Sequence, residues 1–193
     1  MTDSLLMGNI KPDRLPATVA NYLSKLKRNG FEIITEEGDT YVGQERDFIA
    51  KWFYDYVSPV MKEYLMQLNK ENKQVYIEDN SILISATDLV DRTIWWEQFI
   101  KNNPNFISID EATINKNSYL QLLLEGTENS YVVNVDNNKL SDYFKNAYNY
   151  INDKYPSSDA AKLVAPYYAL LKEGKKLKAD SLMNVYRKQG ITG

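Results

Sequence analysis

Apolar residues recur along most of the chain with the spacing of amphipathic helices, and short stretches in the first half are typical of β-strands. Two hairpins are predicted, one pairing residues 31–35 with 40–43 and one pairing 74–77 with 82–85. The helical spacing predicts helices over about 16–29, 45–71, 88–101, 138–155, 157–171 and 176–189. The sequence therefore predicts a mainly α-helical protein with one or two short β-hairpins in its N-terminal half.

The longest predicted helix, residues 45–71, has pairs of apolar residues at every fourth position. Such a wide apolar stripe predicts that this helix forms the spine of the core. Pro59 lies inside it and is expected to kink it or to split it near Val57, because proline cannot donate the backbone hydrogen bond of a helix interior.

Residues 117–135 fit two structures. Residues 119–124 form either a strand that pairs with 131–135 or the end of a helix that stops at Gly126. The internal similarity described next favours the helix, and the hairpin stays open as the alternative.

The second half of the chain contains an internal echo. Residues 99–104 recur in form 52 positions later as residues 151–156, and each copy is the end of an apolar-striped helix closed by a proline. Each copy is followed by a second periodic segment that ends in leucines and a glycine, Gly126 or Gly174. This pattern predicts an array of helical hairpins over residues 88–193, preceded by a flexible arm at 1–12 and a helix and β-hairpin part at 13–87, in one continuous domain.

The second copy carries a family resemblance. The stretch Lys154-Tyr155-Pro156-Ser157-Ser158, the following Ala160-Ala161-Lys162 and then Tyr167-Tyr168 resemble a tetratricopeptide-type (TPR-like) repeat. The similarity extends over residues 88–190 and is nearest to the helical repeats of bacterial envelope proteins, such as outer-membrane-assembly lipoproteins and periplasmic cell-division coordinators. The resemblance implies an interaction scaffold without catalytic residues, in an exported, periplasmic or cell-envelope setting rather than a cytoplasmic one.

The composition of the chain excludes several classes of catalytic and metal-binding site. The 193 residues are 44% apolar and 25% charged, and the net charge of −3 predicts no bulk attraction to nucleic acid. No apolar run has the length of a membrane span, and the first eight residues lack the basic start and apolar stretch of a signal peptide. The chain contains no histidine and no cysteine, so it supplies no Ser-His-Asp triad, no thiolate nucleophile and no zinc site of the usual ligands. No phosphate-binding glycine motif is present, and no cofactor is predicted.

One pair of acids could still hold a divalent metal. Asp88 and Asp91 lie one turn apart at a predicted helix start, where two carboxylates could share Mg²⁺ or Ca²⁺. The alternative is that both acids stabilise the positive end of the helix.

Aromatic residues are the other candidate for a site, with 15 tyrosines, 3 tryptophans and 6 phenylalanines. Adjacent Trp95 and Trp96 are separated by about 100° around a helix, so one of them should point away from the core. Exposed aromatics on the concave side of the C-terminal helices would suit an extended peptide or a glycan. The predicted contacts of that surface are Trp96, Tyr143, Tyr150, Tyr167 and Tyr168.

Three classes of function follow. The first is a non-catalytic binding or scaffolding protein with a protein or peptide partner. The second is a metal-dependent hydrolase that uses Asp88 and Asp91. The third is a small accessory or immunity protein whose acidic stretch at 32–47, with six acids against one arginine, neutralises a basic partner.

Overall fold

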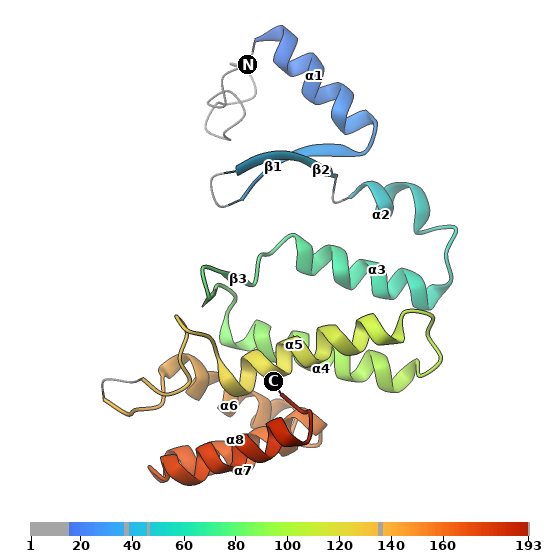
Figure 1. The fold of residues 1–193 in the computed structure, drawn as a ribbon. Coiled ribbons are helices and arrows are strands. Elements are labelled where there is room, and N and C mark those ends of the chain that lie inside the picture. The colour runs from blue at the N-terminus through green and yellow to red at the C-terminus, as the bar shows by residue number, and fades with distance from the viewer. Residues whose placement is uncertain (1–15, 37–38, 46, 135–136, 193) are drawn as a thin grey trace. The chain divides into compact units, whose positions relative to one another are not determined.

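The computed structural model describes residues 16–36, 39–45, 47–134 and 137–192. The chain forms two compact units, Met1–Lys73 and Gln74–Gly193. Figure 1 labels their helices and strands. The boundary therefore lies earlier than the one predicted at residue 87, and the second β-hairpin belongs to the second unit. The arm predicted at residues 1–12 lies outside the described residues.

The described part of the first unit begins with a helix and a hairpin, as predicted. Helix α1 (Ala17–Arg28) ends before Gly30, whose φ of 81° suits a residue without a side chain. Strands β1 (Phe31–Glu36) and β2 (Asp39–Gln44) then pair antiparallel, with Ile33 opposite Val42. Residues 37 and 38, between the two strands, lie outside the described residues.

Pro59 splits the long helix predicted over residues 45–71. Helix α2 (Phe48–Phe53) is separated from helix α3 (Pro59–Asn72), which begins at this proline. The Ser58 side chain accepts a hydrogen bond from the backbone N–H of Met61 and so caps α3. The expectation that this stretch forms the spine of the core is wrong, because Trp52 and Phe53 are exposed and most buried apolar residues lie in the second unit.

The second unit opens with the predicted second hairpin, which is shorter than expected. Strands β3 (Ile77–Glu78) and β4 (Ser81–Ile82) flank a two-residue turn in which Asp79 and Asn80 both have positive φ.

The loop of residues 127–130 clamps this turn. The carbonyl oxygen of Asn80 accepts hydrogen bonds from Asn129 N at 3.1 Å and from the Thr127 hydroxyl, and the carbonyl of Asp79 accepts one from Asn129 Nδ2 at 2.6 Å. Ser130 Oγ accepts a further bond from Ile82 N at 2.9 Å. These four hydrogen bonds join the hairpin to the loop.

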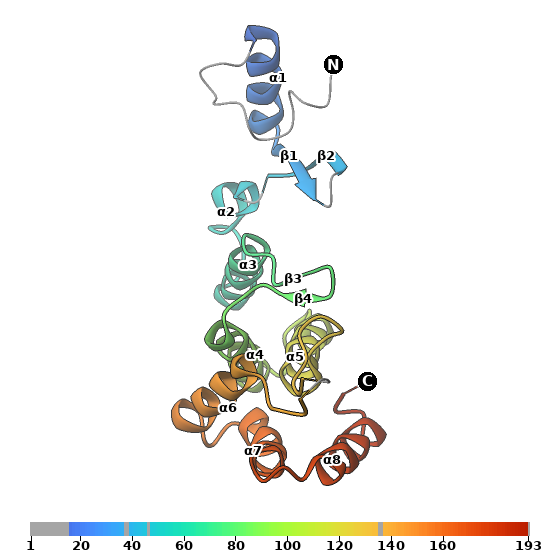
Figure 2. The ribbon, with the colours of Figure 1, turned by 90° about the vertical axis from the view of Figure 1, so that its left-hand side faces the viewer.

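Helices α4 (Ala86–Asn102) and α5 (Ile109–Glu125) lie side by side, as the view along their axes in Figure 2 shows. Residues 119–124 are helical, and α5 stops at Gly126 with a φ of 68°. Residues 117–125 are therefore the end of a helix and 126–134 a loop that follows it, so the strand alternative for 119–124 is wrong.

Three further helices complete the second unit: α6 (Asp142–Lys154), α7 (Asp159–Lys172) and α8 (Lys176–Lys188). Helix α6 packs on α4, and α7 packs on both α6 and α8 (Figure 2). Ser141 and Ser158 cap α6 and α7 through their hydroxyls, which places the start of α6 later than predicted. Helix α7 continues through Pro166.

The two copies of the sequence echo share a backbone turn. Asn103 and Tyr155, each just before the proline, have the same φ of −130° and ψ values of 57° and 46°. Each donates its backbone N–H to the carbonyl four residues earlier, at 3.0 and 2.8 Å. Each also accepts a bond from the N–H three residues later, at 3.0 Å in both copies. The echo in sequence therefore coincides with a matching helix end.

The described part of the chain is mainly helical, with eight helices and two antiparallel hairpins. None of these helices has the length and apolar character needed to cross a bilayer. The largest fully buried side chains all belong to the second unit: Trp96, Tyr148, Phe144, Leu89, Leu123, Leu124 and Ile151.

Candidate functional site

The five predicted contact residues do not share one surface. Trp96 has no exposed area, and Tyr167 and Tyr168 are also buried. Tyr143 and Tyr150 are half-buried, and both hydroxyls donate hydrogen bonds within the fold. The structure thus places three of the five in the core, where a partner that leaves the fold unchanged does not reach them.

The tryptophan pair divides as expected, but in the opposite sense to the predicted contact. The Trp96 ring meets the Trp95 ring edge to face at 4.8 Å and is buried. Trp95 is the partly exposed member, and its ring stacks on Phe99 at 5.1 Å. The rings of both tryptophans and Phe99 form one aromatic cluster on α4.

The buried tyrosines join α6 to α5 and to α7. Tyr148 donates its hydroxyl hydrogen to the carbonyl of Leu123 on α5 at 3.0 Å, and its ring contacts those of Tyr167 and Tyr168. Burial raises the pKa of Tyr148, and it raises the pKa of Tyr167 to about 12. Both tyrosines therefore act as core residues.

Tyr143 lies at the start of α6, where it lines a pocket of about 250 Å³ together with Tyr131. Its hydroxyl donates to the carbonyl of Ile84 at 3.0 Å, and burial raises its pKa. Among the five predicted contacts, Tyr143 and Tyr150 are the two that are not buried.

Asp88 and Asp91 have separate partners. Ser85, the cap of α4, accepts a hydrogen bond from Asp88 N at 3.1 Å and donates one to the Asp88 carboxylate at 2.7 Å. The Ser85 hydroxyl therefore bonds to both the backbone and the side chain of Asp88, which explains an acid at this position without a metal.

Asp91 is the centre of a polar cluster that joins α4 to the end of α6. Its carboxylate accepts hydrogen bonds from the hydroxyls of Tyr150 at 3.1 Å and Tyr155 at 2.8 Å, and from Lys154 Nζ at 3.3 Å. We call these four residues the Asp91 cluster. The Lys154 ammonium also contacts the Tyr150 hydroxyl and lies 4.8 and 5.0 Å from the centres of the two tyrosine rings.

The charges of the Asp91 cluster balance each other. The tyrosine hydroxyls that accept from Lys154, together with Asp91, hold the pKa of that ammonium above its usual value, and partial burial raises the pKa of Tyr155. The Lys154 ammonium lies 3.3 Å from the Asp91 carboxylate and so already balances its charge without a metal. The Asp91 cluster therefore forms a polar contact that holds α4 to the end of α6.

Glu97 makes a second tie. Its two carboxylate oxygens accept hydrogen bonds from the backbone N–H groups of Asp159 and Ala160, each at 2.9 Å, at the first turn of α7. A carboxylate is stabilised there by the positive end of the helix. Asp91 and Glu97 on α4 therefore hold the two sides of the turn that carries the second copy of the echo.

Only some of the charged side chains in the acidic stretch at 32–47 lie within the described residues. Asp47 bonds to Lys73 and to Asn69 Nδ2, and the bond from Lys73 lowers the pKa of Asp47. Asp39 is exposed. Glu37, Arg46 and the side chain of Glu36 lie outside the description, so the accessory-protein interpretation stays a prediction.

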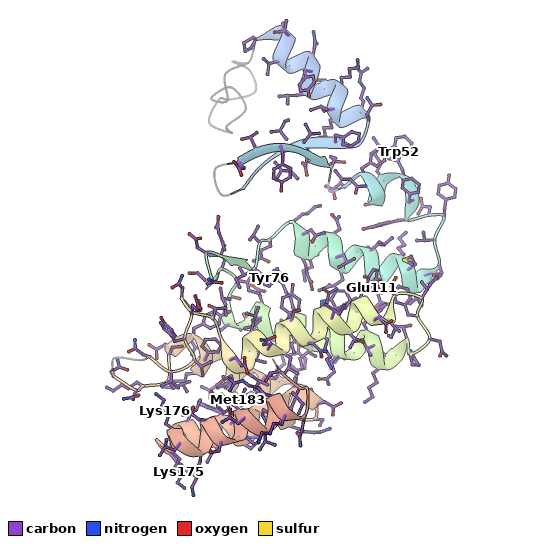
Figure 3. All side chains as sticks on the ribbon, in the orientation of Figure 1. Trp52, Tyr76, Glu111, Lys175, Lys176 and Met183 are labelled. Atoms are coloured by element: carbon purple, nitrogen blue, oxygen red, sulfur yellow. The ribbon has the colours of Figure 1, made fainter. Side chains whose placement is uncertain are left out.

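The first unit exposes a run of large aromatic side chains. Trp52 and Phe53 on α2 are 52% and 51% exposed, and Tyr56 in the following turn is 87% exposed. Figure 3 shows Trp52 on this helix. Phe48 supports the run, because its ring contacts both Trp52 and Phe53 and packs close to Gly30. We call Trp52, Phe53 and Tyr56 the 52–56 aromatic run.

The sequence could have shown this run, since its three large aromatics lie within five positions of a proline-interrupted segment. The wide apolar stripe of residues 45–71 predicts burial instead, so these aromatic side chains were expected in the core.

In the described part of the chain, no three acidic side chains gather where they could hold a metal ion. No protein-family model matches the sequence, and neither a curated protein nor a solved structure matches it.

Proposed function

We propose that this protein is a non-catalytic binding module and that the 52–56 aromatic run is its contact with a protein or peptide partner. The observation that carries the proposal is the exposure of Trp52, Phe53 and Tyr56 on one short segment. Soluble proteins rarely leave such a group of large apolar side chains in water, and tryptophan and tyrosine are the residues that most often dominate binding energy at interfaces.

The local packing favours a prepared contact. Phe48 fixes the base of the run, and Lys51 lies 5.0 Å from the Trp52 ring, so the ring is held between neighbours before any partner arrives. A side chain that is already ordered loses less conformational entropy on binding. The partner expected here presents apolar side chains that cover the Trp52 and Tyr56 rings.

The TPR-like resemblance of residues 88–190 favours the same class of function. The matching turns at Asn103 and Tyr155 support an origin of the two helical hairpins in one repeated unit. The bacterial envelope or exported setting is part of this proposal and comes from the resemblance alone.

The test is selection of binding peptides from a random display library on the full-length protein. We expect the selected peptides to be rich in apolar residues and to lose affinity about thirtyfold for Trp52→Ala, the effect of a strong interface residue. The matched control is Leu177→Ala, which removes an exposed apolar side chain from α8. Peptides that bind Trp52→Ala as well as the parent would refute the aromatic run as the contact.

The competing hydrolase interpretation makes a different prediction. A metal bound by Asp88 and Asp91 would raise the melting temperature in millimolar Mg²⁺, Ca²⁺ or Mn²⁺, and Asp88→Ala/Asp91→Ala would abolish that rise. The binding-module proposal expects no such shift.

A further inference from the structure

The second unit contains an open pocket of about 390 Å³ between the β3–β4 hairpin, α5 and the loop that follows it. Tyr76, labelled in Figure 3, lies at one side of it, and its ring contacts that of Tyr119 on α5 at 5.1 Å. The pocket has the size of sites that bind small molecules. The residues around it are Tyr76, Ile77, Asn80, Ser118, Gln121, Leu122, Gly126, Thr127 and Glu128.

The walls of this pocket are fixed before any ligand binds. The four hydrogen bonds between the β3–β4 hairpin and the 127–130 loop hold two of its sides together. Gly126 forms a corner where no side chain fits, because a Cβ there would lie 2.3 Å from the carbonyl oxygen of Ser130. A wall built in this way keeps its polar groups in place.

Several of those polar groups have capacity left for a ligand. Within the described residues, the Tyr76 hydroxyl and the Gln121 amide make no hydrogen bond, although both residues are half-buried. The Glu128 carboxylate accepts one long bond, from Asn80 Nδ2 at 3.5 Å. Ser118 donates its hydrogen to the Ile114 carbonyl, which leaves its oxygen free to accept.

The chemistry of the lining selects the kind of ligand. The described residues around the pocket include no lysine or arginine, so they offer nothing to neutralise an anion, and a single carboxylate is too few ligands for a metal cation. Amide and hydroxyl groups present donors and acceptors side by side, beside the Tyr76 ring and the apolar Ile77 and Leu122. A sugar ring has this same combination of hydroxyl groups at its rim and C–H groups on its faces.

We propose that this pocket binds a neutral saccharide of one or two rings. Gln121 and Glu128 bond to its hydroxyl or acetamido groups, and the Tyr76 ring packs against a sugar face. The proposal stands apart from the 52–56 aromatic run, because its residues all belong to the second unit.

The experiment is a titration of the isotope-labelled full-length protein with N,N′-diacetylchitobiose and with maltose, followed by nuclear magnetic resonance. Simple sugars bind proteins weakly, so concentrations to about 10 mM are needed to reach a millimolar Kd. We expect the resonances of the Gln121 side-chain amide and of the Gly126 backbone amide to move with at least one of the two sugars.

Two variants of pocket residues and one control variant outside the pocket decide whether the pocket is the site. Gln121→Ala removes the side chain that hydrogen-bonds to the sugar and should weaken binding about five- to tenfold. Gln98→Ala, the same change at an exposed position of α4, should leave the Kd unchanged. Tyr76→Phe removes only a hydroxyl and should weaken binding without unfolding the protein.

Three outcomes would overturn the proposal. The first is that neither sugar moves the Gln121 and Gly126 resonances. The second is that Gln121→Ala binds as well as Gln98→Ala. The third is that a neutral tripeptide, trialanine, moves the same resonances at lower concentration than both sugars, which would identify the pocket as a peptide site.

Discussion

The two units use their aromatic residues in opposite ways. Among the described residues, three apolar side chains are buried in the first unit, Val19, Tyr54 and Tyr64, whereas the second unit buries 24. Of the exposed large aromatic side chains in the same residues, six lie in the first unit and one, Tyr131, in the second. Most of the buried core therefore lies in the second unit, whereas most of the exposed large aromatic side chains lie in the first. The predictions that follow compare matched changes in the two units.

The largest difference is expected between the two tryptophans of opposite exposure. Trp96→Ala opens a cavity in the core of the second unit and should lower its free energy of unfolding by about 3–5 kcal/mol. Trp52→Ala in the first unit should change stability by no more than about 0.5 kcal/mol. Urea denaturation followed by circular dichroism measures both values. Equal losses for the two variants would contradict the contrast between the units.

A glycine tests how the first unit holds its aromatic run. A Cβ added at Gly30, where φ is 81°, would lie 2.7–2.9 Å from atoms of the Phe48 ring. Gly30→Ala should therefore displace Phe48 and destabilise the first unit by about 1–3 kcal/mol. The fluorescence of Trp52, isolated by subtracting the spectrum of Trp52→Phe, should change with it.

Gly174→Ala is the matched control for this glycine. Gly174 also has positive φ, at 67°, but no atom lies within 4 Å of the added Cβ. We expect only the backbone strain of about 1 kcal/mol in the second unit and no change in Trp52 fluorescence. If Gly30→Ala had no larger effect than Gly174→Ala, Phe48 would not be the support of α2.

Alanine substitution of one aspartate in each unit compares how much their polar contacts contribute to stability. Asp91→Ala removes the acceptor of two tyrosine hydroxyls and of Lys154, and should cost the second unit about 1–2 kcal/mol after allowance for its partial exposure. Asp55→Ala breaks the exposed pair with Lys62 in the first unit and should cost about 0–0.5 kcal/mol. Thermal melts in low and high salt check both, and a similar cost for both variants would refute the role of the Asp91 cluster as a tie.

The smallest expected effect is on the pH dependence of the stability of the second unit. Burial raises the pKa of Tyr167 from 10.0 to about 12, so between these values the folded protein keeps a proton that the unfolded chain has released. The contribution of Tyr167 to stability is therefore complete below about pH 10 and falls as the pH rises to about 12. Tyr167→Phe should reduce that fall by on the order of 1 kcal/mol, measured by urea denaturation across this pH range. An unchanged slope in the variant would show that Tyr167 is not protected in the fold.

Local patterns were enough to predict most elements of this fold. Gly30, Gly126 and Gly174 ended the helices where expected, and Pro59 split the long segment. These features depend on backbone geometry within a few residues, which the sequence carries directly. The start of α4 was predicted two residues late, at 88 and not at Ala86, because Ser85, Thr87 and Asp88 are all good caps and only the hydrogen bonds distinguish them.

The candidate sites were harder to predict because burial depends on distant parts of the chain. Trp95 and Trp96 have the same chemistry, and the neighbours that bury Trp96 are chosen by how α4 packs in the folded unit. Asp91 finds its tyrosine partners 59 and 64 residues away, at the end of α6, and no spacing rule covers such contacts. The residues that line the pocket beside the β3–β4 hairpin likewise come from segments that meet only after folding.

The clamp on the β3–β4 turn has a consequence for the order in which the chain folds. Its hydrogen bonds join residues 47 to 50 positions apart, whereas the bonds within each helix join residues about four apart. Closing a loop of that length costs entropy before the contacts repay it, so the helices can form quickly and the clamp must form late. The pocket between this hairpin and α5 is therefore expected to be among the last parts of the second unit to form during refolding, and among the first to open when the protein is stressed.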